Sequence, residues 1–190
     1  MNFDTKHLVR WGIPGWILIM ILGPYIFFNF QNEINDIIKT IDPLALGAFL
    51  TIIGVPLGYL LNQIHHSFFW VVPKFRFSRR ILNQEVWNDY FSKEISLDKL
   101  FFKDEIGKMK KERYQYLLSR KHELGAVTVS IGIALIVIFL VNKMLNVNFG
   151  NWSWWYFWGV FVLFVIIFIS RWYSSKNIDK YFEQYLSESN

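Results

Sequence analysis

Four uncharged apolar segments alternate with charged segments along the chain. They cover residues 11–30, 43–64, 124–142 and 152–170, and none contains Asp, Glu, Lys, Arg or His. A helix of about 20 apolar residues crosses a hydrocarbon core of roughly 30 Å. The pattern therefore predicts an all-α polytopic membrane protein with four transmembrane helices, in which residues 1–65 and 123–172 form two transmembrane hairpins.

The two polar segments show helical periodicity of their own. In residues 66–122, an arm between the second and third spans, we expect a helix that begins near Leu97 and continues into the third span. Residues 173–190 form a tail with apolar residues at i, i+3, i+4, i+7 and i+8, typical of an amphipathic helix with one covered face. These are Ile178, Tyr181, Phe182, Tyr185 and Leu186. They could pack on the arm of the same or another subunit, or dock a separate protein.

Small residues recur on one helical face of the second and third spans. In lipid, small residues let two helix backbones approach closely, which matters because apolar burial gives helices little reason to associate there. The second span carries Gly47, Thr51, Gly54 and Gly58, and the third carries Ala126, Ser130 and Ala134. The pattern predicts either packing of these two spans within one chain or an interface between subunits of a homo-oligomer.

Charge adds an orientation to this picture. Of the 20 Lys and Arg residues, 2 precede the first span, 13 lie between the second and third spans and 3 follow the fourth. Only Lys39 and Lys143 occupy the two remaining loops. Because cytoplasmic loops carry the excess of basic residues, this distribution predicts that both termini and the arm are cytoplasmic. We expect a multi-pass protein of a bacterial inner membrane.

The basic residues of the arm are expected to contact anionic lipids or a protein partner. The arm has 13 basic against 7 acidic residues, interleaved, so its surplus is modest. Positive-inside topology and anionic headgroups account for that surplus. Nucleic acid is not an expected partner. The candidate contact residues are Lys74, Arg76, Arg79, Arg80, Lys108, Lys110, Lys111 and Arg113.

Aromatic content supports the membrane assignment: aromatic residues make up 19% of the chain, and nine are tryptophans. Trp and Tyr favour the headgroup level, so we interpret most of them as interfacial belts. The absence of ionisable groups within the spans argues against proton relays and coupled transport. It leaves open a passive pore lined by polar side chains such as Thr51 and Thr128.

No catalytic, cofactor or metal site is predicted. The chain contains no cysteine, which excludes disulfides and thiolate-bound metals. His65, His66, His122 and Glu123 mark the ends of neighbouring spans, but they lack the H-x-x-x-H and H-E-x-x-H spacings of metal-binding helices. We interpret them as polar caps at the membrane surface. A weaker alternative is an enzyme that modifies lipids with these four residues.

The four-span layout and the segment Trp11-Gly12-Ile13-Pro14-Gly15-Trp16 complete the sequence picture. The layout resembles the small four-span membrane subunits of bacterial anti-phage defence systems, such as the membrane component of Kiwa or the membrane effectors of cyclic-oligonucleotide signalling. The resemblance implies an oligomer in the inner membrane that senses membrane perturbation or acts with a cytosolic partner. Our first hypothesis is thus an oligomeric anchor or sensor subunit that recruits or regulates a cytosolic protein. The alternative is a pore-forming effector or small channel.

Overall fold

A computed structural model of the chain describes residues 5–32, 34, 42–68, 92, 95–99, 101–102, 105–148 and 150–187. These residues are almost entirely helical and contain no strand. The long helices are α1 (Thr5–Asn29), α3 (Pro43–His66), α6 (Glu105–Met144) and α7 (Trp152–Ser187). All four are long and apolar enough to cross a membrane. The prediction of an all-α protein with four candidate membrane spans is therefore confirmed.

The start of α3 follows directly from its sequence. The side chain of Asp42 accepts a hydrogen bond from the backbone N–H of Leu44 at 3.0 Å, and so satisfies one of the open donors at a helix N-terminus. Pro43 occupies the first turn, where its missing N–H costs nothing. Asp-Pro thus fixes the first residue of the second span.

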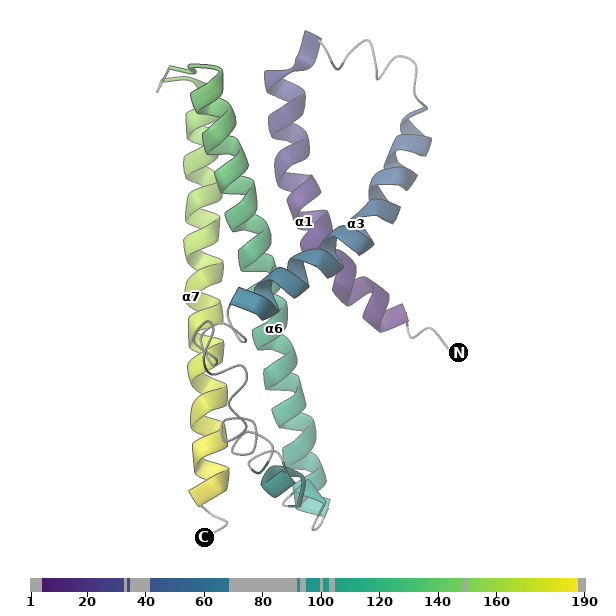
Figure 1. Cartoon of the computed structure of the whole chain (residues 1–190), viewed down its shortest axis with the longest axis vertical. Helices are drawn as coiled ribbons and strands as arrows, with labels where there is room; N and C mark the ends of the chain where they lie inside the picture. The colour runs from purple at the N-terminus through teal and green to yellow at the C-terminus, as the bar shows by residue number, and fades with distance from the viewer. Residues whose placement is uncertain are drawn as a thin grey trace, which may run out of the picture.

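Two helices are much longer than a membrane requires. At 1.5 Å per residue, the 40 residues of α6 span about 60 Å and the 36 residues of α7 about 54 Å. The junction of the arm with the third span is one unbroken helix from Glu105, as expected. Residues 95–99 and 101 are also helical, and residues 103–104 between them and α6 lie outside the described residues. Residues 173–187 of the predicted tail continue α7 in the same way. The two helices run side by side well past the level at which α3 ends (Figure 1).

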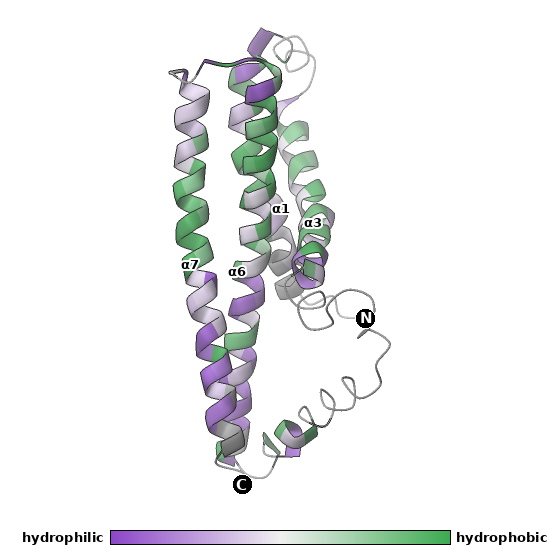
Figure 2. Cartoon of the chain, turned by 60° about the vertical axis from the view of Figure 1, so that its left-hand side comes forward, coloured by the Kyte–Doolittle hydropathy of each residue, from purple (hydrophilic) through white to green (hydrophobic). Residues whose placement is uncertain are grey.

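Hydropathy changes along these two helices. In Figure 2 the middle turns of α7 and most of the upper half of α6 are green, the upper turns of α7 are near white, and the lower turns of both helices are largely purple. The apolar parts correspond to residues 124–142 and 152–170, so the polar continuations lie outside any hydrocarbon layer that the apolar parts cross. We refer to residues 105–123 of α6 with residues 171–187 of α7 as the stalk.

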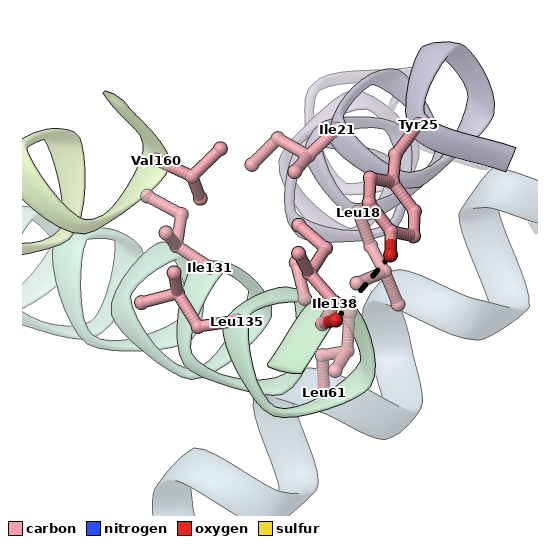
Figure 3. Close-up of a cluster of buried hydrophobic side chains, with 9 residues drawn as sticks. Leu18, Ile21, Tyr25, Leu61, Ile131, Leu135, Ile138 and Val160 are labelled. Atoms are coloured by element: carbon pink, nitrogen blue, oxygen red, sulfur yellow. Dashed lines mark hydrogen bonds between the residues drawn. The ribbon is translucent and has the colours of Figure 1, made fainter. Parts of the chain in front are cut away.

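The four helices form two hairpins that meet on α6. Helix α1 crosses α3 and also packs on α6, and α6 pairs with α7 along its length (Figure 1). A buried apolar cluster at this junction draws on all four helices and includes Leu18, Leu61, Ile131 and Val160. Figure 3 shows these side chains pointing toward one another across α1, α3, α6 and α7. The core therefore holds the two hairpins together.

Hydrogen bonds supplement the core near the end where α6 joins α7. Tyr25 is fully buried, and its hydroxyl donates to Asn142 Oδ1 at 2.7 Å and lies 3.4 Å from the carbonyl oxygen of Ile138 (Figure 3). The Tyr156 hydroxyl donates to the carbonyl oxygen of Ile21 at 2.7 Å. These bonds join α1 to α6 and α7. They matter because, in lipid, apolar contact alone gives helices little reason to associate.

Candidate functional site

The crossing of α1 and α3 is a close contact between two backbones. A Cβ atom at Gly15 would overlap the carbonyl oxygen of Gly54 and lie 2.6 Å from the nitrogen of Gly58. One at Gly58 would overlap the carbonyl oxygen of Trp11. Only glycine fits at such positions. The half of the predicted stripe that contains Gly54 and Gly58 therefore packs on α1, a partner that neither sequence alternative, the third span or another subunit, had named.

The other half of the stripe is not covered by any of the residues that the structure describes. Gly47 has open space around its Cα, and Thr51 is exposed. The Thr51 hydroxyl donates to the carbonyl oxygen of Gly47 in the same helix at 2.8 Å. The backbone carbonyl of Thr51 accepts from the Trp16 indole at 3.0 Å. The predicted face is therefore divided into a covered half and an exposed half.

The small residues of α6 are all covered. Ala126, Ser130 and Ala134 are 3%, 0% and 0% exposed. The Ser130 hydroxyl donates to the carbonyl oxygen of Pro14 at 2.6 Å, which joins α6 to α1. These three residues serve packing within the chain. Because Thr128 is also buried, at 2% exposed, and bonds its own helix, it does not face the same space as Thr51.

The histidines meet at the end of the bundle where α3 stops, which we call the histidine end (His65, His66 and His122). His65 is only 3% exposed. A Cβ atom at Gly125 of α6 would overlap its imidazole ring, so Gly125 provides the notch that accepts this ring. The His122 ring lies 6.0 Å from that of His65 and 6.2 Å from that of His66, with which it stacks. The positions of these histidines at the ends of neighbouring spans predicted that they lie near one another. The contact of His65 with Gly125 was not predicted.

A pocket of about 280 Å³ opens beside the histidine end, between α1, α3 and α6. Its polar lining comes from Asn62, His66, His122 and Glu123, and Trp11 and Ile13 supply an apolar wall. The Glu123 carboxylate accepts a hydrogen bond from the Ser119 hydroxyl at 3.0 Å. No group of three or more His, Asp or Glu side chains within the described residues is arranged to hold a metal ion. The lining of this pocket therefore offers side-chain hydrogen-bond donors and one carboxylate.

The tail residues that are described pack on α6 of the same chain. Ile178 is 4% exposed. The Tyr181 hydroxyl donates to the carbonyl oxygen of Lys110 at 3.3 Å, and the Arg113 guanidinium lies 5.4 Å from the Tyr181 ring centroid. A partly exposed ion pair, Lys121 with Asp179 at 3.9 Å, adds little by comparison. The side chains of Phe182, Tyr185 and Leu186 lie outside the described residues.

The opposite face of the stalk is exposed and partly apolar. On α6, Ile106, Met109 and Tyr116 are 61%, 72% and 62% exposed, and their spacing puts them near one face. Lys108 and Arg113 lie exposed on the same helix, while Lys110 and Lys111 are half-buried. We call Ile106, Met109 and Tyr116 the stalk stripe. The other predicted basic residues, Lys74, Arg76, Arg79 and Arg80, lie outside the described residues.

Two tryptophans have packing roles that the belt interpretation did not assign to them. Trp16 lies against Gly54, where the absence of a side chain leaves room for its ring. Trp154 is 4% exposed, and its indole donates to the carbonyl oxygen of Val147 at 3.0 Å. Trp155, Trp158 and Trp172 are 73%, 50% and 61% exposed, as a belt requires. A tryptophan one helical turn from a glycine, such as Trp16 after Gly12 or Trp11 before Gly15, could have indicated a helix crossing.

Comparisons with known proteins identified no relative of the chain. No protein-family model matches the chain, and it has no significant match among curated proteins or solved structures.

Proposed function

We propose that the chain is an oligomeric membrane anchor or sensor subunit that recruits or regulates a soluble protein partner. The observation that carries this proposal is the stalk, in which α6 and α7 continue beyond their apolar parts as unbroken, mutually packed helices. Its exposed stripe gives a partner an apolar surface with charged residues of both signs beside it. Exposed apolar patches that no membrane covers are typical of interaction sites.

The cellular setting is part of the same proposal. The charge distribution supports a bacterial inner membrane with both termini and the stalk in the cytoplasm. The resemblance of the layout to membrane subunits of anti-phage defence systems supports a role in such a system. A partner that fits the stalk stripe would carry an apolar groove with charged groups of both signs at its rim, because exposed Glu112 and Arg113 both lie beside the stripe.

Partner capture tests the proposal. We expect the tagged full-length protein, purified from its native host in mild detergent, to bring a soluble protein in near-integral ratio. Met109→Glu with Tyr116→Glu should reduce that recovery by about tenfold or more, because charges would enter a desolvated contact. The measurement is mass spectrometry with quantification of the recovered protein.

Gln115→Glu is the matched control, since it adds a charge to an exposed position of the same helix outside the stripe. Equal recovery with the double variant would remove the stalk stripe as the docking surface. Recovery of the chain alone would contradict the recruiting function and favour the pore, for which electrical recording in bilayers is the next measurement.

A separate prediction concerns the proposed oligomer, whose interface we place at the exposed residues Gly47 and Thr51 of α3. Gly47→Leu is expected to shift native mass spectra from oligomer toward monomer, because the added side chain would hold a neighbouring helix away from the small face of Gly47 and Thr51. Gly159→Leu is the control, because Gly159 also has open space around it but lies on α7. An unchanged oligomer in Gly47→Leu would exclude this face as the interface, and a monomeric wild-type protein would exclude the oligomer.

A further inference from the structure

The pocket at the histidine end has the size of a small polar group. Ligand pockets for whole small molecules are typically about 300–1,000 Å³. At about 280 Å³, this one lies just below that range, so it suits a headgroup-sized moiety better than a nucleotide or an entire lipid. Three helices contribute to it: α1 with Trp11, α3 with Asn62 and His66, and α6 with His122 and Glu123.

The side chains that line the pocket include both hydrogen-bond donors and an anionic acceptor. The imidazoles of His66 and His122 and the amide of Asn62 can donate hydrogen bonds, and phosphate oxygens accept such bonds. The Glu123 carboxylate, which accepts from Ser119, can also accept from an ammonium, and the Trp11 ring offers a face on which an ammonium is favourable. An anion alone would not use the Glu123 carboxylate, and a cation alone would not use the N–H donors of the imidazoles and the amide. A group that carries a phosphate and an ammonium matches the whole lining.

The position of the pocket indicates where such a group would come from. His66 is the last residue of α3, and Glu123 directly precedes the apolar part of α6, so the pocket lies where an apolar layer gives way to polar surroundings. Ile13, which also lines the pocket, is 40% exposed. It continues the wall toward the apolar outer surface of α1. Headgroups lie at this depth, and acyl chains lie along such surfaces.

We propose that this pocket binds the phosphoethanolamine headgroup of an amine phospholipid, with the phosphate at His66, His122 and Asn62 and the ammonium at Glu123 and Trp11. Nothing in this inference depends on the recruiting function proposed above, because it concerns only the chain and the bilayer. Its failure and the failure of partner capture are therefore separate results.

Native mass spectrometry of the full-length protein tests the proposal without any substitution. The protein in detergent is mixed with equal amounts of phosphatidylethanolamine, phosphatidylglycerol and phosphatidylcholine of the same short acyl chains. We expect phosphatidylethanolamine to be bound with about a tenfold preference, which corresponds to one charge-assisted contact that the other two headgroups cannot make equally well. Equal binding of the three lipids, or no binding, would overturn the proposal.

Glu123→Gln identifies the pocket as the site of that preference. We expect the variant to bind the three lipids about equally, and Glu112→Gln, at an exposed carboxylate elsewhere on α6, to keep the preference. A preference that survives in Glu123→Gln would place the lipid elsewhere and overturn the assignment. Soluble phosphoethanolamine is the last arm: if it competes as well as the lipid at equal concentration, the headgroup chemistry stands and the membrane source is rejected.

Discussion

Replacing Gly58 with alanine is expected to separate α1 from α3 and to lower the free energy of unfolding by about 3 kcal/mol. The added methyl group would overlap the carbonyl oxygen of Trp11 and lie 2.9 Å from the nitrogen of Gly15. Both neighbours are backbone atoms, which cannot turn aside as the end of a side chain can. The cost therefore falls at the upper end of the range of about 1–3 kcal/mol for added atoms in a packed interior.

Thermal unfolding in detergent, followed by tryptophan fluorescence, measures this effect. A loss of about 3 kcal/mol corresponds to a Tm lower by roughly 6–12 °C for a chain of this size. Gly159→Ala is the control, because Gly159 has open space around it and alanine is the better helix former. Equal Tm values for Gly58→Ala and wild type would show that the two helices do not cross at these glycines.

Replacing Gly125 with alanine is the second change with a large expected effect, because it would close the notch that accepts His65. We expect a loss of about 2 kcal/mol in the free energy of unfolding, since the added methyl group would force the buried imidazole out of the notch. In a chain that already carries His65→Ala, the same substitution should cost less than about 0.5 kcal/mol, because the ring that it displaces is gone.

This coupling is measured with the four chains of a double-mutant cycle: wild type, the two single variants and the double variant. Gly132→Ala serves as the matched control on α6, because a Cβ atom there would meet Phe164 at an ordinary 3.5 Å. If Gly125→Ala costs the same with and without His65, the notch is not what holds the ends of α3 and α6 together.

The candidate spans were predictable because the membrane imposes a length on any helix that crosses it. Between Ser170 and Lys176 the chain has no proline or glycine, so the continuation of α7 past its apolar part is consistent with local sequence. Helical periodicity near Leu97 indicates a covered face, and residues 95–99 and 101 are helical with Leu97 only 5% exposed. Periodicity does not fix the first residue of a helix.

The partners of each helical face could not be predicted. Spacing showed that Gly54 and Gly58 share one face of the second span, but periodicity carries no information about which helix covers that face. Here it is α1, through Gly15 and Trp11. The contact of His65 with Gly125 was missed for the same reason, since the two residues lie far apart in sequence and match no known spacing motif.

The unbroken course of α6 through the bundle has a mechanical consequence. A continuous helix resists bending, so its polar half tilts by the same angle as its apolar half. The part from Glu105 to Glu123 is about 28 Å long, and a tilt of about 10° would displace its tip by roughly 5 Å. A change in bilayer thickness alters the tilt of spanning helices. Stretching or thinning of the membrane would thus become a sideways movement of Ile106 and Met109 at the far end of the protein.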